Sequence, residues 1–165
     1  NCWIKHNHDN LTFNVAKRLA KLVNMPLKNA ETFQVIYYGV SQEYRPHYDG
    51  WLFDGSDKSN RCLRLGGNRL ITALCYLNTV EEGGGTGFTK LKLKCPSEKR
   101  KVVVFENCHK GSNLRHELSE HAGLPVKKGE KYAFNLWFRE EKFGVPNKRI
   151  SLEIENKPKF KNDKP

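Results

Sequence analysis

The stretch from Arg45 to Gly50, R-P-H-Y-D-G, places an imidazole and a carboxylate two residues apart. In a strand, residues two apart project to the same face, so His47 and Asp49 can point toward one metal ion. The pair alone is weak evidence, because H-x-D also arises by chance and then only forms part of a turn. A third ligand and a suitably spaced cation would strengthen the metal hypothesis.

The segment from His121 to Lys131, H-A-G-L-P-V-K-K-G-E-K, supplies both. Two histidines and one carboxylate on one face of an ion leave three positions open, which is the ligand set of non-haem Fe(II) oxygenases. A 2-oxo acid fills two of these positions and dioxygen takes the third. If the acid is 2-oxoglutarate, Lys131 is the expected partner of its far carboxylate. His116, in L-R-H-E-L, is a rival third ligand, but only His121 is in register with G-x-P-V-x-x-G-x-K.

Length and composition indicate one globular domain. The chain has 165 residues, 38% apolar and 28% charged, which is enough to bury a core and unlike a disordered or membrane protein. No run approaches a transmembrane span, and no segment has the order of a secretory signal. The chain begins with Asn1 rather than Met, which leaves room for an upstream signal or anchor, so the localisation stays open.

The net charge of +11 is compatible with attraction to nucleic acid or to acidic substrates. No helical basic stripe and no nucleic-acid motif accompanies it, so a solvated basic surface is the preferred interpretation. Much of the charge lies in the runs Lys90–Lys101, Lys127–Lys131 and Lys157–Lys164. The five cysteines are scattered and contain no Cys-x-x-Cys pair, which argues against a structural zinc site. Reduced thiols are expected, with one disulfide as the open alternative.

The periodicity predicts one helix and then mostly strands. Asn10 is predicted to cap a helix that runs to about Val23, with Pro26 just beyond. Strands are predicted at 32–38, Leu70–Leu77, Lys101–Phe105 and Lys131–Arg139. This order favours a mainly β fold with supporting helices, a sandwich or barrel. A parallel Rossmann arrangement would need helices between the strands, and none is predicted there.

Two segments stand apart from this pattern. Leu52–Asn68 is predicted to be irregular, and a loop of that length is typical of a lid or a binding loop. Near the C-terminus, Arg149–Glu155 alternates as an edge strand would, and the last ten residues, basic and interrupted by prolines, are predicted to form a loose tail. We therefore expect one domain over residues 1–148, followed by the edge strand and basic tail over 149–165.

Five sequence blocks together resemble a known family. They are Q-V-I-Y-Y, Y-R-P-H-Y-D, N-R-L-I-T-A-L-C-Y-L-N, E-E-G-G-G-T-G-F and H-A-G-L-P-V-K-K-G-E-K-Y-A-F-N-L-W-F-R-E, in that order. From about Phe33 to Glu140 the chain is similar to the prolyl 4-hydroxylase-like branch of the Fe(II)/2-oxoglutarate-dependent dioxygenases. The resemblance implies a double-stranded β-helix, or jelly roll.

The resemblance also implies an activity and its cofactors. It predicts a dioxygenase that uses Fe(II), 2-oxoglutarate and dioxygen, converts 2-oxoglutarate to succinate, and hydroxylates a C–H bond. The predicted substrate is a prolyl residue in a peptide or protein, held in an extended segment that aromatic side chains can grip. Ascorbate is implied as the agent that restores Fe(II).

Site residues follow from the resemblance, position by position. The iron ligands fall on His47, Asp49 and His121, and the 2-oxoglutarate lysine falls on Lys131, with no catalytic residue predicted beyond the metal site. Positions whose hydroxyls assist the 2-oxoglutarate carboxylate fall on Tyr38 and Thr86, which otherwise would be a core aromatic and a turn residue. Positions that contact a peptide substrate fall on Tyr44, Arg69 and Trp137, the last of which could equally belong to the core.

Two alternatives come from other functional classes. A nucleic-acid dioxygenase is suggested by the charge, but the residues after His121 offer a lysine and lack the arginine-rich ending of that branch. The second alternative is a binding module that keeps the fold without turnover, which the presence of all four residues His47, Asp49, His121 and Lys131 disfavours.

Overall fold

The structure, a computed structural model, describes residues 1–147. The edge strand predicted at Arg149–Glu155 and the predicted tail lie outside the described residues. The elements are, in chain order, β1 (Cys2–Ile4), α1 (Asn10–Leu22), η1 (Leu27–Asn29), β2 (Phe33–Tyr38), β3 (Tyr44–His47), α2 (Asp57–Leu63), β4 (Arg69–Tyr76), β5 (Glu82–Gly83), β6 (Thr86–Phe88), β7 (Leu93–Cys95), β8 (Val102–Glu106), η2 (Glu117–Ser119), β9 (His121–Gly123), β10 (Val126–Lys128) and β11 (Lys131–Arg139).

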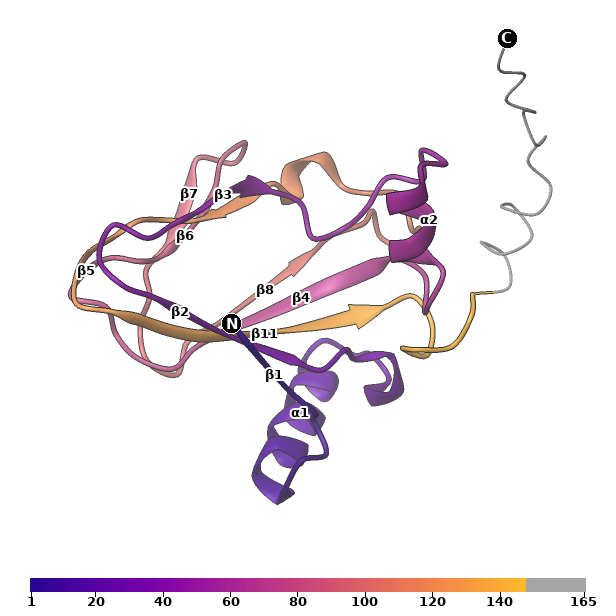
Figure 1. Cartoon of the computed structure of the whole chain (residues 1–165), viewed down its shortest axis with the longest axis horizontal. Coiled ribbons are helices and arrows are strands. Elements are labelled where there is room, and N and C mark those ends of the chain that lie inside the picture. The colour runs from indigo at the N-terminus through magenta and orange to yellow at the C-terminus, as the bar shows by residue number, and fades with distance from the viewer. Residues whose placement is uncertain (148–165) are drawn as a thin grey trace, which may run out of the picture.

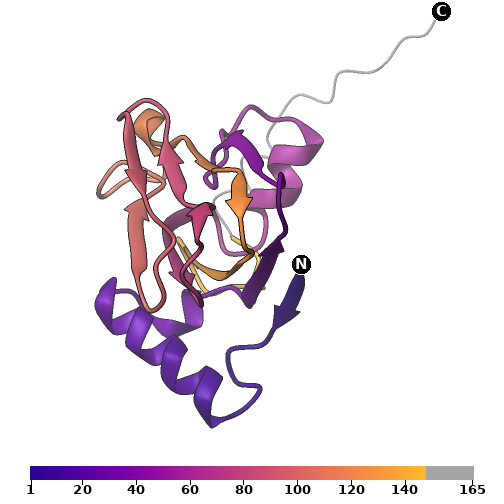
Figure 2. The same cartoon turned by 90° about the vertical axis from the view of Figure 1, so that its left-hand side faces the viewer.

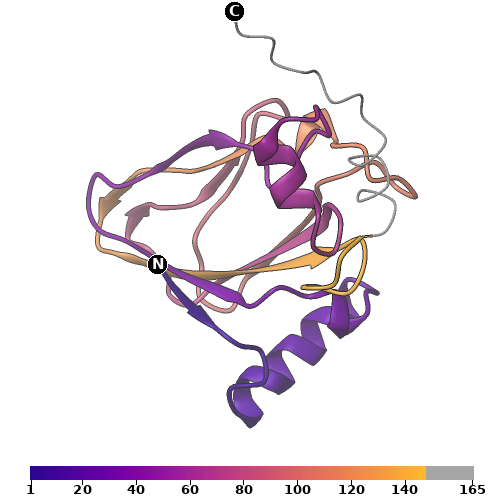
Figure 3. The same cartoon turned by 45° about the vertical axis from the view of Figure 1, so that its right-hand side comes forward.

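Two antiparallel sheets face each other in the jelly roll that the sequence predicts (Figures 1 and 3). The larger sheet has the strand order β1-β2-β11-β4-β8, and the smaller has the order β3-β9-β6-β7. β10 pairs with β5 at one end. The longest strand, β11, lies between β2 and β4, so its inward side chains face the smaller sheet from the middle of the larger one.

Helix α1 packs against the outer face of the larger sheet (Figure 2). Its apolar positions recur at helical spacing, and their burial stabilises the sheet from outside. The core that they share with the sheet contains Ala16, Leu19, Ala20, Ala30, Phe33, Ala73, Cys75, Leu136 and Phe138.

The predicted helix is confirmed, but its predicted cap is wrong. Asp9, rather than Asn10, is the N-cap: its carboxylate accepts a hydrogen bond from the Thr12 backbone N–H at 2.8 Å. The Asp9 backbone N–H in turn donates to the Thr12 hydroxyl at 3.1 Å. This reciprocal capping box satisfies two backbone donors and makes Asn10 the first helical residue.

The predicted strands correspond to β2, β4, β8 and β11, each within one residue at either end. The segment Leu52–Asn68, predicted to be irregular, contains the short helix α2. Ser56 caps it by accepting a hydrogen bond from the Ser59 N–H at 3.2 Å. A helix therefore does lie between β3 and β4, although the antiparallel pairing excludes a Rossmann arrangement.

The five cysteines all lie within the described residues and are free thiols; Cys75 and Cys108 are buried, and burial raises the pKa of each to about 12. None of the helices within residues 1–147 has the length and apolar character that crossing a membrane requires.

Candidate active site

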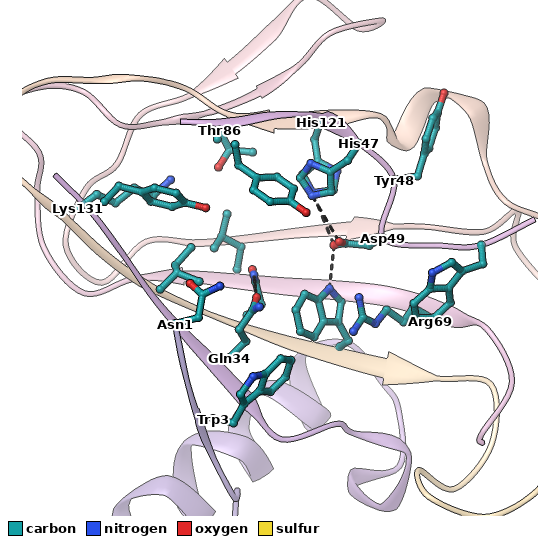
Figure 4. Close-up of a pocket in the computed structure, with 18 of the residues that line it drawn as sticks. Asn1, Trp3, Gln34, His47, Tyr48, Asp49, Arg69, Thr86, His121 and Lys131 are labelled. Carbon is teal, nitrogen blue, oxygen red and sulfur yellow. Dashed lines mark hydrogen bonds and ion pairs between the residues drawn. The ribbon is translucent and has the colours of Figure 1, made fainter. Parts of the chain in front are cut away.

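A pocket of about 450 Å³ lies between the two sheets. Its lining includes every site residue that the sequence predicts, which the fold brings together from β2, β3, β4, β6, β9 and β11 and the turn after β3. They are Tyr38, Tyr44, His47, Asp49, Arg69, Thr86, His121, Lys131 and Trp137. Figure 4 shows the histidines, Asp49, Lys131 and Arg69 around this pocket.

His47, Asp49 and His121 form a compact cluster of possible metal ligands. His47 ends β3 and is the cross-strand partner of His121, the first residue of β9. The Nε2 atoms of the two rings lie 3.7 and 3.6 Å from the Asp49 carboxylate oxygens. Two ligand atoms that each bind one ion at ~2.1 Å are at most about 4.2 Å apart, so these separations suit a shared ion. The predicted metal-binding role fits this geometry.

Backbone carbonyls fix the orientation of both imidazoles. His47 Nδ1 donates to the Arg45 carbonyl and His121 Nδ1 to the Ser119 carbonyl, each at 2.9 Å. A neutral ring that donates from Nδ1 carries its lone pair on Nε2, the atom turned toward Asp49. Burial, and secondarily the neighbouring His121, lower the pKa of His47, which favours the neutral ligand form.

Asp49 is positioned by the larger sheet and not by its own strand. β3 ends at His47, so the prediction that His47 and Asp49 share one strand face is wrong. Thr72 Oγ1 and Trp137 Nε1 donate to Asp49 Oδ2 at 2.7 and 2.8 Å. Thr72 and Trp137 are cross-strand partners on β4 and β11, which brings the two donors to one oxygen. Oδ1 is left available for a metal.

Asn107 supports the contact between Thr72 and Asp49. The Asn107 amide donates to Thr72 Oγ1 at 2.8 Å, so the Thr72 hydroxyl proton is directed to Asp49. Asn107 and Thr72 are both buried. Sequence reasoning missed both residues; the only signal was a threonine within the otherwise apolar run L-I-T-A-L.

Lys131 is a buried cation that has no anionic partner among the described residues. Its side chain is only 1% exposed, and no carboxylate within residues 1–147 forms an ion pair with it. Burial lowers its pKa to about 8, and its Nζ lies 5.4 Å from the Tyr38 ring and 5.3 Å from the Tyr76 ring. A buried ammonium is tolerable when a ligand carboxylate pairs with it, so the pocket suits an anionic ligand.

Thr86 and Tyr38 lie in the same part of the pocket as Lys131. The Tyr76 hydroxyl donates to Thr86 Oγ1 at 2.6 Å, and no described residue accepts the Thr86 hydroxyl proton, which remains available to a ligand oxygen. Gly83, the last residue of β5 and three residues before β6 begins at Thr86, adopts a φ of +79°, and a side chain there would clash with the Pro125 carbonyl oxygen. Tyr76 is a supporting residue that the sequence did not indicate.

Arg69 is held by a buried ion network. Its Nε and Nη2 donate to Glu31 at 2.7 and 2.9 Å, and Arg139 Nε donates to the same carboxylate at 2.7 Å. The Arg69 guanidinium also stacks 3.7 Å from the Trp137 ring and 4.7 Å from the Trp51 ring. Glu31 and Arg139, neither of them predicted, thus fix Arg69 at the wall of the pocket.

Tyr44 and Trp137, both predicted to contact a substrate, lie in different surroundings. Tyr44 is exposed, and its ring packs edge-on 4.1 Å from the His47 ring, so it borders the open side of the cluster. Trp137 is 4% exposed and is tied to Asp49, so its indole supports a proposed metal ligand as well as lining the pocket. Lys131 and Trp137 are six residues apart on β11, an even spacing that puts both side chains on one face of the strand, and both line the pocket.

The rival histidine belongs to a different cluster. His116 stacks on the His109 ring at 4.3 Å and lies near Glu117, on the loop before β9. The structure therefore places His121, and not His116, beside His47 and Asp49. His109 is exposed, and its Nε2 lies 3.2 Å from the Glu117 carboxylate.

A jelly roll with two histidines, one carboxylate and a buried lysine in a single pocket defines a class of iron oxygenase. Residues 33–139 match the sequence profile of the 2OG-Fe(II) oxygenase superfamily. The chain belongs to that superfamily, and the predicted resemblance is confirmed.

Its relatives are prolyl hydroxylases by name. A protein of Acanthamoeba polyphaga mimivirus, named a prolyl 4-hydroxylase by inference, is 37% identical over 141 residues, which is 86% of this chain and 57% of that protein. "Prolyl 4-hydroxylase 5" of Arabidopsis thaliana is 32% identical over 87% of this chain and 53% of its own length. This chain thus spans little more than half of each of these relatives.

One solved structure is similar to this chain over most of the length of both. The viral collagen prolyl hydroxylase of Paramecium Bursaria Chlorella virus-1, in its 2OG complex, is 32% identical with a TM-score of 0.71. The match covers 84% of this chain and 77% of that one.

Proposed function

We propose that this protein is an Fe(II)- and 2-oxoglutarate-dependent dioxygenase that hydroxylates a prolyl residue in a peptide or protein. The observation that carries the proposal is that the Lys131 ammonium, which has no ion-pair partner within residues 1–147, lies in the same pocket as the His47, Asp49 and His121 cluster. A dicarboxylate with one end at the metal and the other at a lysine needs both features. The names of the relatives supply the substrate class.

Each group of residues has a defined task in this proposal. The two Nε2 atoms and Asp49 Oδ1 would hold the iron. Lys131, with the Thr86 hydroxyl, would bind the far carboxylate of 2-oxoglutarate and so set its orientation. Arg69, fixed by Glu31, and the exposed Tyr44 ring border the space left for the peptide.

The bound cofactors supply the chemistry of dioxygen activation: one oxygen atom enters the C–H bond, and the other enters succinate as carbon dioxide leaves 2-oxoglutarate. The protein orients one substrate carbon and excludes water from the reacting atoms. The buried position of Asp49, His121 and Lys131 is suited to that exclusion.

The test is incubation of (Pro-Ala)5, (Pro-Pro-Gly)5 and a methylated oligonucleotide with the protein, Fe(II), 2-oxoglutarate and ascorbate, followed by mass spectrometry. The proposal expects a gain of one oxygen atom on prolyl residues, coupled to succinate. Oxidation of the oligonucleotide alone would identify a nucleic-acid dioxygenase. Binding of Fe(II) and 2-oxoglutarate without any turnover would identify a binding module.

A further inference from the structure

A pair of side-chain amides lies on the floor of the pocket. Gln34 on β2 and Asn135 on β11 are cross-strand partners, and Asn135 Nδ2 donates to Gln34 Oε1 at 3.1 Å. Both side chains line the pocket and are partly buried. Neither makes another side-chain hydrogen bond within residues 1–147. One hydrogen bond between two amides leaves one NH2 group and one carbonyl oxygen available, here those of Gln34 and Asn135.

A free donor beside a free acceptor matches the backbone of a peptide. One peptide residue presents a carbonyl oxygen, which the Gln34 NH2 group can bind, and an N–H, which the Asn135 oxygen can accept. A ligand that bonds to both groups replaces their contacts with water by direct hydrogen bonds, which adds a modest net affinity and fixes the direction of the ligand. An aliphatic ligand or a lone proline ring does not satisfy them.

Trp3, Gln34 and Asn135 lie in one row across three neighbouring strands. β1 pairs with β2 so that Trp3 lies directly opposite Gln34, which itself lies opposite Asn135. Trp3 is 55% exposed, and its ring is 6.0 Å from the Trp137 ring at an angle of 39°. Figure 4 shows Trp3 and Gln34 together on the side of the pocket away from the histidines. A flat apolar surface therefore stands next to the amide pair.

The distance from Trp3 to the proposed metal site suits a short peptide segment. Trp137 contacts Asp49 at 2.8 Å and Trp3 at 6.0 Å between rings, so the Trp3 ring lies on the order of 10 Å from Asp49. A polyproline II segment rises ~3.1 Å per residue, so about three to four residues span this distance. Proline rings pack well on aromatic surfaces, and such segments bind in aromatic-lined grooves.

We propose that Trp3, Gln34 and Asn135 form a second substrate subsite, which binds residues about three to four positions from the hydroxylated proline, with the proline at the fourth position on Trp3. Trp3 packs against a prolyl ring, and the amide pair hydrogen-bonds the backbone of a neighbouring residue that is not proline, because proline has no N–H. The inference rests on the proposed prolyl hydroxylase function. It predicts a preference for sequences in which proline alternates with other residues over uninterrupted polyproline.

The experiment measures binding of (Pro-Ala)5 and of decaproline to the protein loaded with Fe(II) and 2-oxoglutarate, by calorimetry without oxygen. Trp3→Ala and Gln34→Glu are the test variants; the glutamate still accepts from Asn135 but has lost the NH2 group. We expect each to weaken (Pro-Ala)5 binding about tenfold, the loss that corresponds to ~1.4 kcal/mol. We expect wild type to bind (Pro-Ala)5 more tightly than decaproline, and Trp3→Phe to retain most of the affinity.

Tyr37→Ala is the matched control, since Tyr37 is an exposed aromatic on the opposite face of β2. It should leave peptide affinity unchanged, and 2-oxoglutarate affinity and the melting temperature should stay constant across the set.

Unchanged (Pro-Ala)5 affinity in both Trp3→Ala and Gln34→Glu, with hydroxylation intact, would overturn the subsite and leave the proposed function standing. A parallel loss of peptide affinity, 2-oxoglutarate affinity and melting temperature would show a merely structural role and also overturn it. If wild type neither binds nor hydroxylates any prolyl peptide, the proposed function fails and the subsite fails with it.

Discussion

The indole of Trp137 donates a hydrogen bond to Asp49 Oδ2 at 2.8 Å, which links the centre of the larger sheet to a proposed iron ligand. Thr72 donates to the same oxygen at 2.7 Å. These two bonds hold the carboxylate so that Oδ1 is free for the metal. We therefore expect Trp137 to affect metal binding through Asp49, in addition to the substrate contact proposed for it.

Trp137→Phe should weaken iron binding. The phenyl ring fills most of the same space but cannot donate to Asp49, and loss of a group that orients a metal ligand commonly costs about 10–100-fold in metal affinity. Metal titration under anaerobic conditions measures the effect. Trp51→Phe is the control, because the Trp51 ring also stacks on Arg69 but does not bond to Asp49. Equal iron affinities for the two variants would contradict this role.

His121→Ala should abolish iron binding, whereas His116→Ala should preserve it. His121 shares the cluster with His47 and Asp49, and His116 is stacked on His109 outside the pocket. The same titration separates the two histidines. Retention of iron by His121→Ala together with its loss in His116→Ala would show that the third ligand has been misassigned.

Lys131→Met should stabilise the ligand-free protein while lowering its affinity for 2-oxoglutarate about ten- to a hundredfold. Burial lowers the pKa of Lys131 from its ordinary 10.5 to about 8, so between these values the folded state binds fewer protons than the unfolded state. The free energy of unfolding of wild type should therefore rise with pH over that window. At pH 7 the methionine variant avoids a cost of about 3 kcal/mol. Denaturant unfolding at pH 7 and pH 10 measures both effects.

The affinity for 2-oxoglutarate should fall with rising pH, whereas the free energy of unfolding rises. The ammonium becomes neutral as the pH rises above about 8, so wild-type affinity for 2-oxoglutarate should fall there. Calorimetry at two pH values in the presence of metal checks this. If the Lys131→Met variant bound 2-oxoglutarate as tightly as wild type, Lys131 would have no role in binding it.

Glu31→Gln should destabilise the fold. Glu31 is 4% exposed and neutralises both Arg69 and Arg139, so loss of its charge leaves buried guanidinium groups uncompensated, at a cost of about 3–5 kcal/mol. Glu82→Gln is the control, because its exposed pair with Lys127 is worth less than about 1 kcal/mol. A comparison of the two variants by denaturant unfolding is decisive: similar stabilities would show that the buried network contributes little.

The long strands and the first helix could be predicted because their periods extend over several residues. β1, β5, β6, β7, β9 and β10 have two or three residues each, too few to show any alternation. Helix α2 has the largely polar sequence D-K-S-N-R-C-L, with no apolar stripe to reveal it. Its cap at Ser56 was the only local signal.

The candidate ligands could be predicted because their chemistry appears in the sequence at recognisable spacings. The groups that support them could not, because their roles depend on cross-strand register. Thr72 lies opposite Trp137, and Gln34 opposite both Trp3 and Asn135, only once the strands are paired. Glu31 and Arg139 likewise meet across more than one hundred residues of chain.

The most direct test of the proposed function is oxidation of (Pro-Ala)5 and (Pro-Pro-Gly)5 in isotopically heavy dioxygen, with Fe(II), 2-oxoglutarate and ascorbate present. The account predicts one heavy oxygen atom on a prolyl residue and one in succinate for each 2-oxoglutarate consumed, and neither product with His121→Ala. Absence of heavy oxygen from every prolyl peptide, in a preparation that demonstrably binds Fe(II) and 2-oxoglutarate, would contradict it.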